Sequence, residues 1–382
     1  MKFLSDLKKK DLKGKICLLR IDLNIKDSEL DKNNLRIQAI LPTIKFLLKN
    51  GVKVVLLSHR GRPDHKPQTT NHKLTLRPFV KIFKSLLNQQ VYFVDFKKFN
   101  KATIANYSIV LLENLRFLKG EEENNNKAAE QLASLGDFFV NDAFAVSHRA
   151  NASVAAITKF MPSYAGLLLE KEIKNLNRAV KDHRNHLIVV LGGAKISGKI
   201  GVIKNLMRKA DYFLIGGAIA NTFVKAEGLP IGVSLYDADK VDFAKGLLKK
   251  YGEKIILPAD YFISERQIRD IGPNTAKMYS DIIKKAKIII WNGPMGCFEN
   301  PKFAKGSKAI AKAIINNKKA FAVIGGGETA SLFNDGRFAI NDKRLFVSTG
   351  GGAMLEYLAG KKLPGIAALN GRASPKILGW KL

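Results

Sequence analysis

The sequence is poor in cysteine, acidic residues and long apolar runs, and each shortage excludes a class of protein. Its 382 residues include two cysteines, Cys17 and Cys297, too few for a disulfide framework, so a reducing environment is expected. No apolar run approaches the ~20 residues of a membrane-spanning helix. The amino-terminal stretch MKFLSDLKKKDLKGK has neither the apolar core nor the cleavage site of a secretory signal. We therefore expect a cytoplasmic protein with no membrane partner.

Acidic residues are about half as numerous as basic ones, 33 against 64, which gives a net charge of +31. A charge of this size is typical of proteins that bind nucleic acids. The excess is mostly lysine spread along expected helices, and no basic run is interleaved with aromatic residues. A nucleic-acid-binding protein without activity stays an alternative, which steeply salt-dependent binding without turnover would favour. We expect no nucleic-acid partner.

The length and the pattern of apolar runs predict two domains. A chain of 382 residues exceeds the usual size of one hydrophobic core. Apolar runs alternate with helical patterns in both halves, which is typical of parallel sheets covered by helices. We expect an α/β fold of two doubly wound, Rossmann-like domains joined by a long amphipathic helix. The expected boundaries are an amino-terminal domain at 1–165, a connecting helix and hinge at 166–186, a carboxyl-terminal domain at 187–365 and a tail at 366–382.

The strands of the two halves end differently. In the first half, the apolar runs end in polar and charged tips, as in ICLLRIDLN, VVLLSHRGRP, SIVLLENLRF and DFFVNDAF. In the second half they end in glycines, as in LIVVLGG, YFLIGG, IIIWNGP, FAVIGGG and LFVSTGGG. Ligands of α/β sheets bind beyond the carboxyl ends of the strands. One sheet would thus offer arginines to a carboxylate or phosphate, and the other backbone amides to a nucleotide. This contrast predicts a two-substrate enzyme with one substrate per domain.

Arginine is informative in a chain dominated by lysine, because its planar guanidinium grips an oxyanion with defined geometry. His59 could be a structural histidine, but next to Arg62 we expect it to be a donor to the substrate. No Ser-His-Asp, Cys-His or paired-histidine metal pattern occurs, so covalent catalysis is not suggested. The arginines at or near strand ends of the first half are Arg36, Arg62, Arg116 and Arg149.

A phosphate-loop pattern occurs where GAKISGK follows an expected strand. The next residue is Ile200, whereas a P-loop needs Ser or Thr there to hold magnesium, so a P-loop NTPase is disfavoured. Lys195 and Lys199 are four residues apart at an expected helix start and should share a face. Together with the amides of Gly192 and Gly193, they predict an anion site.

Ten motifs occur in the order seen in phosphoglycerate kinases, over about residues 3–368: RIDLN, SHRGRP, LLENLRF, VNDAFAVSHRANAS, LLLEKEI, GGAKISGKI, GGAIANTF, WNGPMGCFE, GGGETA and STGGGAMLEYLAGKKLPG. The sequence therefore resembles that family. The resemblance implies reversible transfer of a phosphoryl group from 1,3-bisphosphoglycerate to ADP, giving 3-phosphoglycerate and ATP, with magnesium, in glycolysis. It implies direct in-line transfer with domain closure, and we expect a monomer. A different ATP-dependent kinase or ligase acting on a small carboxylate is the other alternative.

The resemblance also implies roles for individual residues. The phosphoglycerate would be held by Asp22, Asn24, Arg36, His59, Arg62, Arg116 and Arg149. The nucleotide would be bound by Gly192, Gly193, Lys195, Lys199, Gly216, Gly217, Gly272, Asn292, Pro294, Glu299, Gly325, Gly326, Gly327, Glu328 and Thr329. The catalytic groups would be Arg36, Lys195, Lys199, Gly350, Gly351 and Gly352, and the metal ligand would be Glu328.

Several positions depart from the family pattern. Glu328 stands where the family commonly has Asp, so its carboxylate is one methylene longer. Gly198 precedes the second lysine in place of a polar residue, and SHRGRP adds Arg60. Asn151 replaces a histidine and Cys297 replaces a valine, and the tail after Leu369 exceeds the common ending. None of these changes removes a group that the chemistry requires.

Overall fold

The structure, a computed structural model, describes residues 1–63, 71–96, 100–181, 186–333 and 342–371. The chain divides into two compact units. Unit 1 holds Met1–Ile173 and the described residues from Lys362 onward, and unit 2 holds Lys174–Lys361. The chain after Lys361 thus returns to unit 1, whereas the sequence pattern placed residues up to 365 in the second domain. The expected hinge residues 182–185 and tail residues 372–382 lie outside the described residues.

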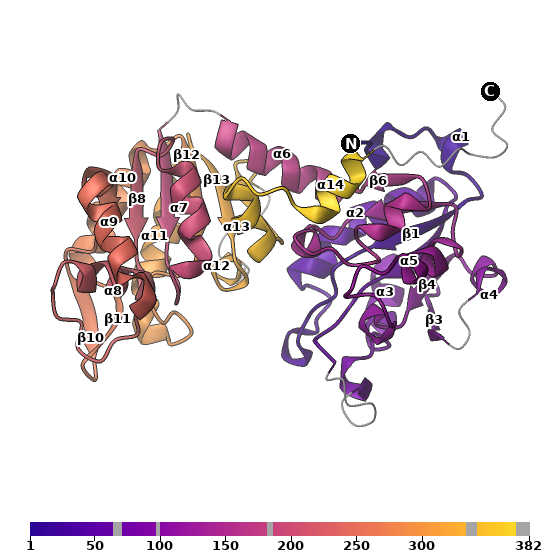
Figure 1. The fold of residues 1–382 in the computed structure, drawn as a ribbon, viewed down its shortest axis with the longest axis horizontal. Helices are drawn as coiled ribbons and strands as arrows, with labels where there is room; N and C mark the ends of the chain where they lie inside the picture. Colours follow the sequence, from indigo (N-terminus) through magenta and orange to yellow (C-terminus); the bar gives the residue numbers. More distant parts are fainter. Residues whose placement is uncertain (64–70, 97–99, 182–185, 334–341, 372–382) are drawn as a thin grey trace. The chain divides into compact units, whose positions relative to one another are not determined.

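Unit 1 contains a parallel sheet, as the sequence predicted, and this sheet has six strands (Figure 1). Its strand order is β3-β4-β2-β1-β5-β6. The strands are β1 Ile16–Arg20, β2 Lys53–Leu57, β3 Tyr92–Val94, β4 Ile109–Leu112, β5 Phe138–Asn141 and β6 Ser163–Ala165. The helices are α1 Lys9–Leu12, α2 Leu35–Lys49, α3 Phe79–Leu87, α4 Lys101–Ala105, α5 Asn126–Ala133 and α14 Pro364–Asn370, together with the first part of α6 Leu167–Lys181.

Both faces of this sheet are buried, because successive strand residues point to opposite sides. Leu19 packs in one hydrophobic cluster with residues of α2 and α3, including Ile44 and Phe83. Its neighbour Leu18 packs in a second cluster with residues of α4 and α5, including Leu132. Burial on both faces explains why the strands read as continuous apolar runs.

Unit 2 contains a second six-stranded parallel sheet, of order β14-β13-β12-β7-β8-β9, with helices on both sides of it (Figure 1). Its strands are β7 Leu187–Leu191, β8 Tyr212–Ile215, β9 Ile255–Ile256, β12 Ile288–Asn292, β13 Phe321–Gly325 and β14 Leu345–Val347, and a separate hairpin is formed by β10 Tyr261–Ser264 and β11 Gln267–Ile271. Its helices are α7 Ile200–Leu206, α8 Gly217–Ala226, α9 Val241–Tyr251, α10 Pro273–Lys285, α11 Lys305–Asn316, α12 Gly327–Ser331 and α13 Gly352–Leu358, and the second part of α6 also belongs here. Within the described residues, no helix combines the length and the hydropathy needed to cross a bilayer.

Each sheet reverses its strand order once. In unit 1, β2 lies on one side of β1 and β5 lies on the other. In unit 2, β8 lies on one side of β7 and β12 lies on the other. Open α/β sheets bind ligands at such switch points, beyond the carboxyl ends of the strands. The polar tips of unit 1 and all five glycine-ended strands of unit 2 therefore gather at the expected edges.

A carboxylate after β5 holds the start of α6. Asp142 Oδ1 accepts hydrogen bonds from the backbone amides of Leu168 (2.8 Å) and Leu169 (3.1 Å). A Cβ atom at residue 166 would lie 2.2 Å from this oxygen, so Gly166 is required by close approach. Burial raises the pKa of Asp142 to about 6. The charged form of this carboxylate is thus less favourable in the folded protein than in the unfolded chain.

We predict that Asp142→Asn becomes more stable relative to the parent as pH rises. Since folding raises the pKa of Asp142, its favourable contribution is complete below pH 3.8 and is lost by about pH 6. The amide keeps an acceptor for α6 and removes the buried charge, a gain on the order of 2 kcal/mol. Urea unfolding of both proteins between pH 4 and pH 7 measures the difference.

Asp137→Asn is the matched control, because its expected sign is opposite. Burial alone would raise the pKa of Asp137, but hydrogen bonds from Lys101 and from the amide of Ile16 lower it. This variant should lose stability relative to the parent as pH rises. A parallel pH dependence of the two variants would contradict the account of Asp142.

Candidate active site

An ion pair and a set of backbone contacts join the ends of β1 and β2 in unit 1. Arg36, near the start of α2, lies 2.9 Å from the carboxylate of Asp22 and donates to the carbonyl of Asn24 at 2.8 Å. The side-chain oxygen of Asn24 accepts the amide of Gly61 at 2.9 Å. The side chain of Arg36 remains 34% exposed. It is therefore oriented by protein contacts and still open to an anion.

His59, at the end of β2, is buried among positive charges. Arg20 Nη2 lies 3.3 Å from His59 Nδ1. Burial, and then the charge of Arg20, lowers the pKa of His59 to about 3, with smaller contributions in the same direction from Arg116 and Arg149. The carboxylate of Asp22 opposes the shift without reversing it. His59 is therefore neutral near pH 7, so it can offer a ligand a hydrogen bond but no charge.

Three further arginines gather after β2, β4 and β5. Arg116 donates to the carbonyl of Gly61 and pairs with Glu122 at 3.3 Å. Burial lowers the pKa of Arg116; Glu122 opposes this, whereas the charges of Arg149 and Arg62 add to it. Cations crowded so closely favour a bound anion, which would relieve their mutual repulsion. The structure thus brings together the seven residues expected at the phosphoglycerate site: Asp22, Asn24, Arg36, His59, Arg62, Arg116 and Arg149.

Sequence reasoning did not identify Asn114, which joins two of these strand ends. Its side-chain amide donates to the carbonyls of Arg60 (2.7 Å) and Leu74 (2.9 Å). Its oxygen accepts the backbone amides of Arg60 (3.2 Å) and Arg116 (3.1 Å). Four hydrogen bonds on one buried side chain fix the loops that carry His59 and Arg116. The signal was present, since Asn114 is the second residue after the apolar run of β4.

Arg60, the added arginine of SHRGRP, has a structural position. It is 3% exposed, donates to the carbonyl of Ile25 at 2.9 Å and pairs with Asp27. Its guanidinium also lies over the ring of Phe79, 5.5 Å from the centroid. Arg60 therefore ties the end of β2 to the segment after β1.

Two glycines of unit 2, Gly192 and Gly193, make close backbone contacts at the point where the strand order reverses. The amide of Gly192 donates to the carbonyl of Asn292 (3.0 Å), and that of Gly193 donates to Pro294 (2.8 Å). A Cβ atom at residue 192 would lie 2.0 Å from the carbonyl oxygen of Pro294. The sequence interpretation of these two amides as anion donors is therefore wrong, because the protein already uses both. Only glycine lets the ends of β7 and β12 approach this closely.

Four more glycines of unit 2 also make close contacts within the protein. The amides of Gly216 and Gly217 donate to Leu191 and Met295, both at 2.8 Å. Gly272 precedes α10, outside the six-stranded sheet, and a Cβ there would lie 2.3 Å from the carboxyl carbon of Asp260. The amide of Gly350 donates to the hydroxyl of Ser348 at 3.0 Å.

The second half of the predicted nucleotide set surrounds the ends of β12, β13 and β14. Asn292 is buried beside Gly326, and Thr329 Oγ1 accepts the amide of Gly293 at 2.8 Å. The sheet register places Asn292 opposite Gly325. Glu299 is exposed beyond β12. Open space, in which a Cβ would meet no atom within 4 Å, adjoins Gly327, Gly351 and Gly352.

Lys195 and Lys199 do not share a helix face. Residues 197–199 form a turn of 3₁₀ helix and α7 begins only at Ile200, so Lys195 precedes the helical segment. Lys195 is exposed and Lys199 is buried, with its ammonium beside Gly193. Burial lowers the pKa of Lys199, and the charge of Glu328 opposes this. Lys199 and Glu328 are thus electrostatic neighbours at the glycine-rich edge.

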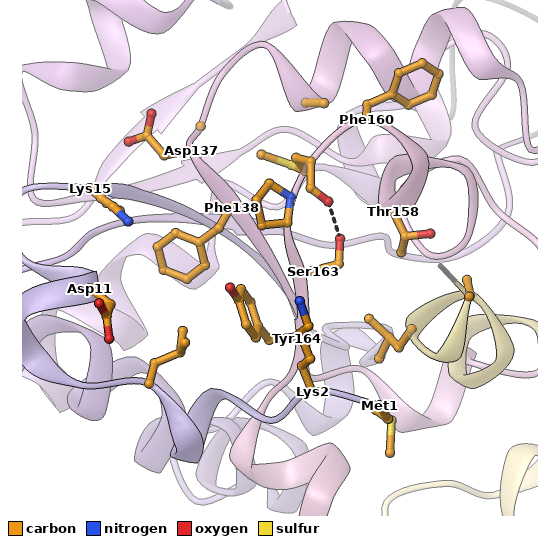
Figure 2. A pocket seen from close by; sticks show the side chains of 18 of the residues that line it. Met1, Lys2, Asp11, Lys15, Asp137, Phe138, Thr158, Phe160, Ser163 and Tyr164 are labelled. Atoms are coloured by element: carbon orange, nitrogen blue, oxygen red, sulfur yellow. Dashed lines mark hydrogen bonds between the residues drawn. The ribbon is translucent and has the colours of Figure 1, made fainter. Parts of the chain in front are cut away.

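One cavity of unit 1 lies away from the carboxyl-terminal edge of its sheet. It encloses about 1270 Å³ in unit 1, and residues that precede β1, β5 and β6, such as Lys15, Asp137 and Pro162, line it. Figure 2 shows Phe138 and Tyr164 in its wall, and their rings meet edge to face at 6.0 Å. The lining residues lie at or just before the starts of strands. The cavity is therefore at the amino-terminal edge of the sheet, opposite the arginine cluster.

Comparison with known proteins agrees with this arrangement. The sequence model of phosphoglycerate kinase matches residues 6–361. Phosphoglycerate kinases of Staphylococcus aureus strains JH9 and Newman are 43% identical over 401 residues, which cover 97% of this chain and 99% of theirs. The solved phosphoglycerate kinases of Coxiella burnetii and Pyrococcus horikoshii OT3 superpose with TM-scores of 0.80 and 0.84 at 35% and 33% identity. Each superposition covers 97% of this chain. It covers 99% of the Coxiella chain and 98% of the Pyrococcus chain. The chain belongs to the phosphoglycerate kinase family.

Proposed function

We propose that the two sheet edges divide the substrates of the phosphoglycerate kinase reaction between them. The chain is a phosphoglycerate kinase by family, an enzyme of glycolysis. Its substrates would be 1,3-bisphosphoglycerate and ADP, exchanged for 3-phosphoglycerate and ATP. The observation that carries the division is the crowding of Arg116 and Arg149 around a neutral His59 in unit 1, with Arg62 near Arg116.

The arginines of unit 1 would bind the carboxylate and phosphate of phosphoglycerate by charge-assisted hydrogen bonds. Arg36 would do more, because its ion pair with Asp22 holds it at the start of α2 while leaving part of it exposed. There it would neutralise charge that develops on the transferred phosphoryl. Asp22 itself stays ionised: burial alone would raise its pKa, but the charge of Arg36, the hydrogen bond from the amide of Asn24 and the charge of Arg20 lower it.

In unit 2, the open backbone at Gly327, Gly351 and Gly352 would admit the nucleotide phosphates closely. Lys199 would neutralise them from its buried position, and Lys195 would act from the surface. Glu299, Asn292 and Pro294 would complete the nucleoside pocket. Because the amides of Gly192, Gly193, Gly216 and Gly217 donate within the protein, we propose that these glycines shape the pocket by their lack of side chains.

Magnesium would accompany the nucleotide. The described residues hold no group of three or more His, Cys, Asp and Glu that could bind a metal by themselves. One exposed carboxylate, Glu328, beside Lys199 fits a cation that takes most of its ligands from phosphate oxygens and water. Bound there, magnesium would neutralise phosphate charge. Glu328 would supply the protein ligand, directly or through a water, at the start of α12.

Direct transfer requires the acyl phosphate of one substrate to touch the β-phosphate of the other. We therefore propose that the enzyme closes during the reaction, which also excludes the water that would hydrolyse the acyl phosphate. We propose a cytoplasmic monomer. A coupled assay of ATP formation from 1,3-bisphosphoglycerate and ADP tests the overall activity; its absence in folded protein would overturn it.

We predict that Arg36→Ala lowers kcat at least ~100-fold, because it removes a cation from the transition state. Arg36→Lys should recover only part of the rate, since an ammonium lacks the planar fork. Steady-state kinetics in both directions measure the effect. An unchanged kcat in Arg36→Ala would refute the assignment.

The two sites should be separable by binding measurements. Arg62→Ala and Arg116→Ala should weaken 3-phosphoglycerate binding about tenfold or more and leave ADP binding nearly intact, because each removes a charged donor. Glu299→Ala should do the reverse. Calorimetry of each variant with each ligand tests this, with Arg77→Ala as the control, since Arg77 lies over the ring of Phe93. Equal weakening of both ligands by Arg116→Ala would contradict the division.

Glu328 should govern the magnesium requirement. Glu328→Asp keeps the charge and should change that requirement modestly, whereas Glu328→Gln removes it and should raise the magnesium concentration for half-maximal rate about tenfold or more. A magnesium titration of the rate for the three proteins measures this. If Glu328→Gln matched the parent at limiting magnesium, Glu328 would be only an acid at a helix start, favourable to the dipole.

A further inference from the structure

A buried chain of hydrogen bonds runs from Glu121 through Ser153 and Arg20 to His59. Ser153 Oγ donates to Glu121 Oε1 at 2.6 Å and accepts from Arg20 Nε at 2.9 Å. Arg20 Nη2 then lies 3.3 Å from His59 Nδ1. None of the four side chains is more than 3% exposed. The chain therefore connects the end of β1, the end of β2 and the loops after β4 and β5.

The chemistry of the last link fixes the proton on His59. A guanidinium has only donors and stays protonated in proteins. Nδ1 of His59 must therefore accept, and the single ring proton of the neutral imidazole lies on Nε2. We propose that Arg20, oriented by Ser153 and Glu121, is a positioning residue that holds His59 as a neutral Nε2–H donor for phosphoglycerate.

The rest of the network keeps Arg20 in place. Its Nη1 donates to the carbonyl of Ile21 at 2.5 Å, so three of its nitrogens are engaged at once. Glu121 supplies the opposite charge and is held in turn by the amide of Ser153, 3.0 Å from Oε2. Arg20 is thus surrounded by protein, and it acts on the substrate site through His59.

Among the described residues, four charged groups act on the His59 ring. Arg20 comes from β1, Asp22 follows β1, Arg116 follows β4 and Arg149 follows β5. Three of these four are cations, and together with burial they lower the pKa of His59 to about 3. His59 should therefore keep one charge state from pH 5 to pH 8, where an unperturbed histidine would titrate.

The first test uses the parent protein without substrate. Long-range ¹⁵N–¹H correlation spectra of selectively labelled protein report which ring nitrogen of each histidine is protonated, and His59→Gln identifies the His59 signals. We expect a lone pair on Nδ1 and a proton on Nε2, unchanged from pH 5 to pH 8. A proton on Nδ1, or a His59 that is charged at pH 7, would overturn the proposal.

The second test breaks the chain at its middle. Ser153→Ala removes the acceptor of Arg20 Nε, so the pKa of His59 should rise and the Nε2–H form should lose population. The KM for 3-phosphoglycerate should rise about 3- to 10-fold, with smaller changes in kcat and in the KM for ATP. Ser147→Ala is the matched control, because Ser147 is a buried serine of the same loop whose hydroxyl donates to Ala143.

A double variant, Arg20→Gln with Glu121→Gln, removes both charges without leaving one buried alone, and it should shift the His59 pKa upward further than Ser153→Ala does. Equal effects of Ser153→Ala and Ser147→Ala on the His59 spectra would overturn the proposal. The inference rests on the proposed phosphoglycerate site only for its kinetic consequence. Spectra as expected without a change in KM would count against His59 as a ligand, whereas wrong spectra would count against Arg20.

Discussion

The parallel register of the strands is the constraint on which both sites depend. Arg20 lies opposite Leu57 in β2 and opposite Asn141 in β5, so the residues that follow these three strands emerge at one level. In unit 2, Asn292 is level with Leu191 and with Gly325. The central strands are buried on both faces, so slipping one of them by a residue would exchange the environments of all its side chains. The sites are therefore as rigid as the two sheets.

The two edges handle charge in opposite ways. Unit 1 places several arginines close together. A few carboxylates, such as Asp22, Glu121 and Glu122, partly offset their mutual repulsion. His59 adds no further charge there, because burial and its cationic neighbours keep it neutral. In unit 2 the buried ammonium of Lys199 lies near Glu328, and glycine backbone forms much of the rest of the edge. A small, highly charged acid suits the first edge, and a flat nucleoside with a phosphate chain suits the second.

Much of this was readable in the sequence. The apolar runs of VVLLSHRGRP and SIVLLENLRF form most of β2 and β4, and the long helix expected within 166–186 is α6. Local signals explain this accuracy: Asn34 caps α2 with a hydrogen bond to the amide of Arg36. The arginines were also recognisable as candidate anion-binding residues, because the chain is dominated by lysine and only arginine has a planar guanidinium. These features depend on neighbouring residues and on composition, which a sequence states directly.

What the sequence by itself determined was therefore the two-sheet α/β class, the edge at which each site lies and the kinds of residue found there. Only the tertiary structure decided where individual donors point. The amides of Gly192 and Gly193 contact another strand 100 residues away, and Lys195 and Lys199 diverge because α7 starts late. The chain from Glu121 to His59 joins four segments that are distant in sequence. Hydrogen bonds of that kind follow from packing in three dimensions, and no local spacing encodes them.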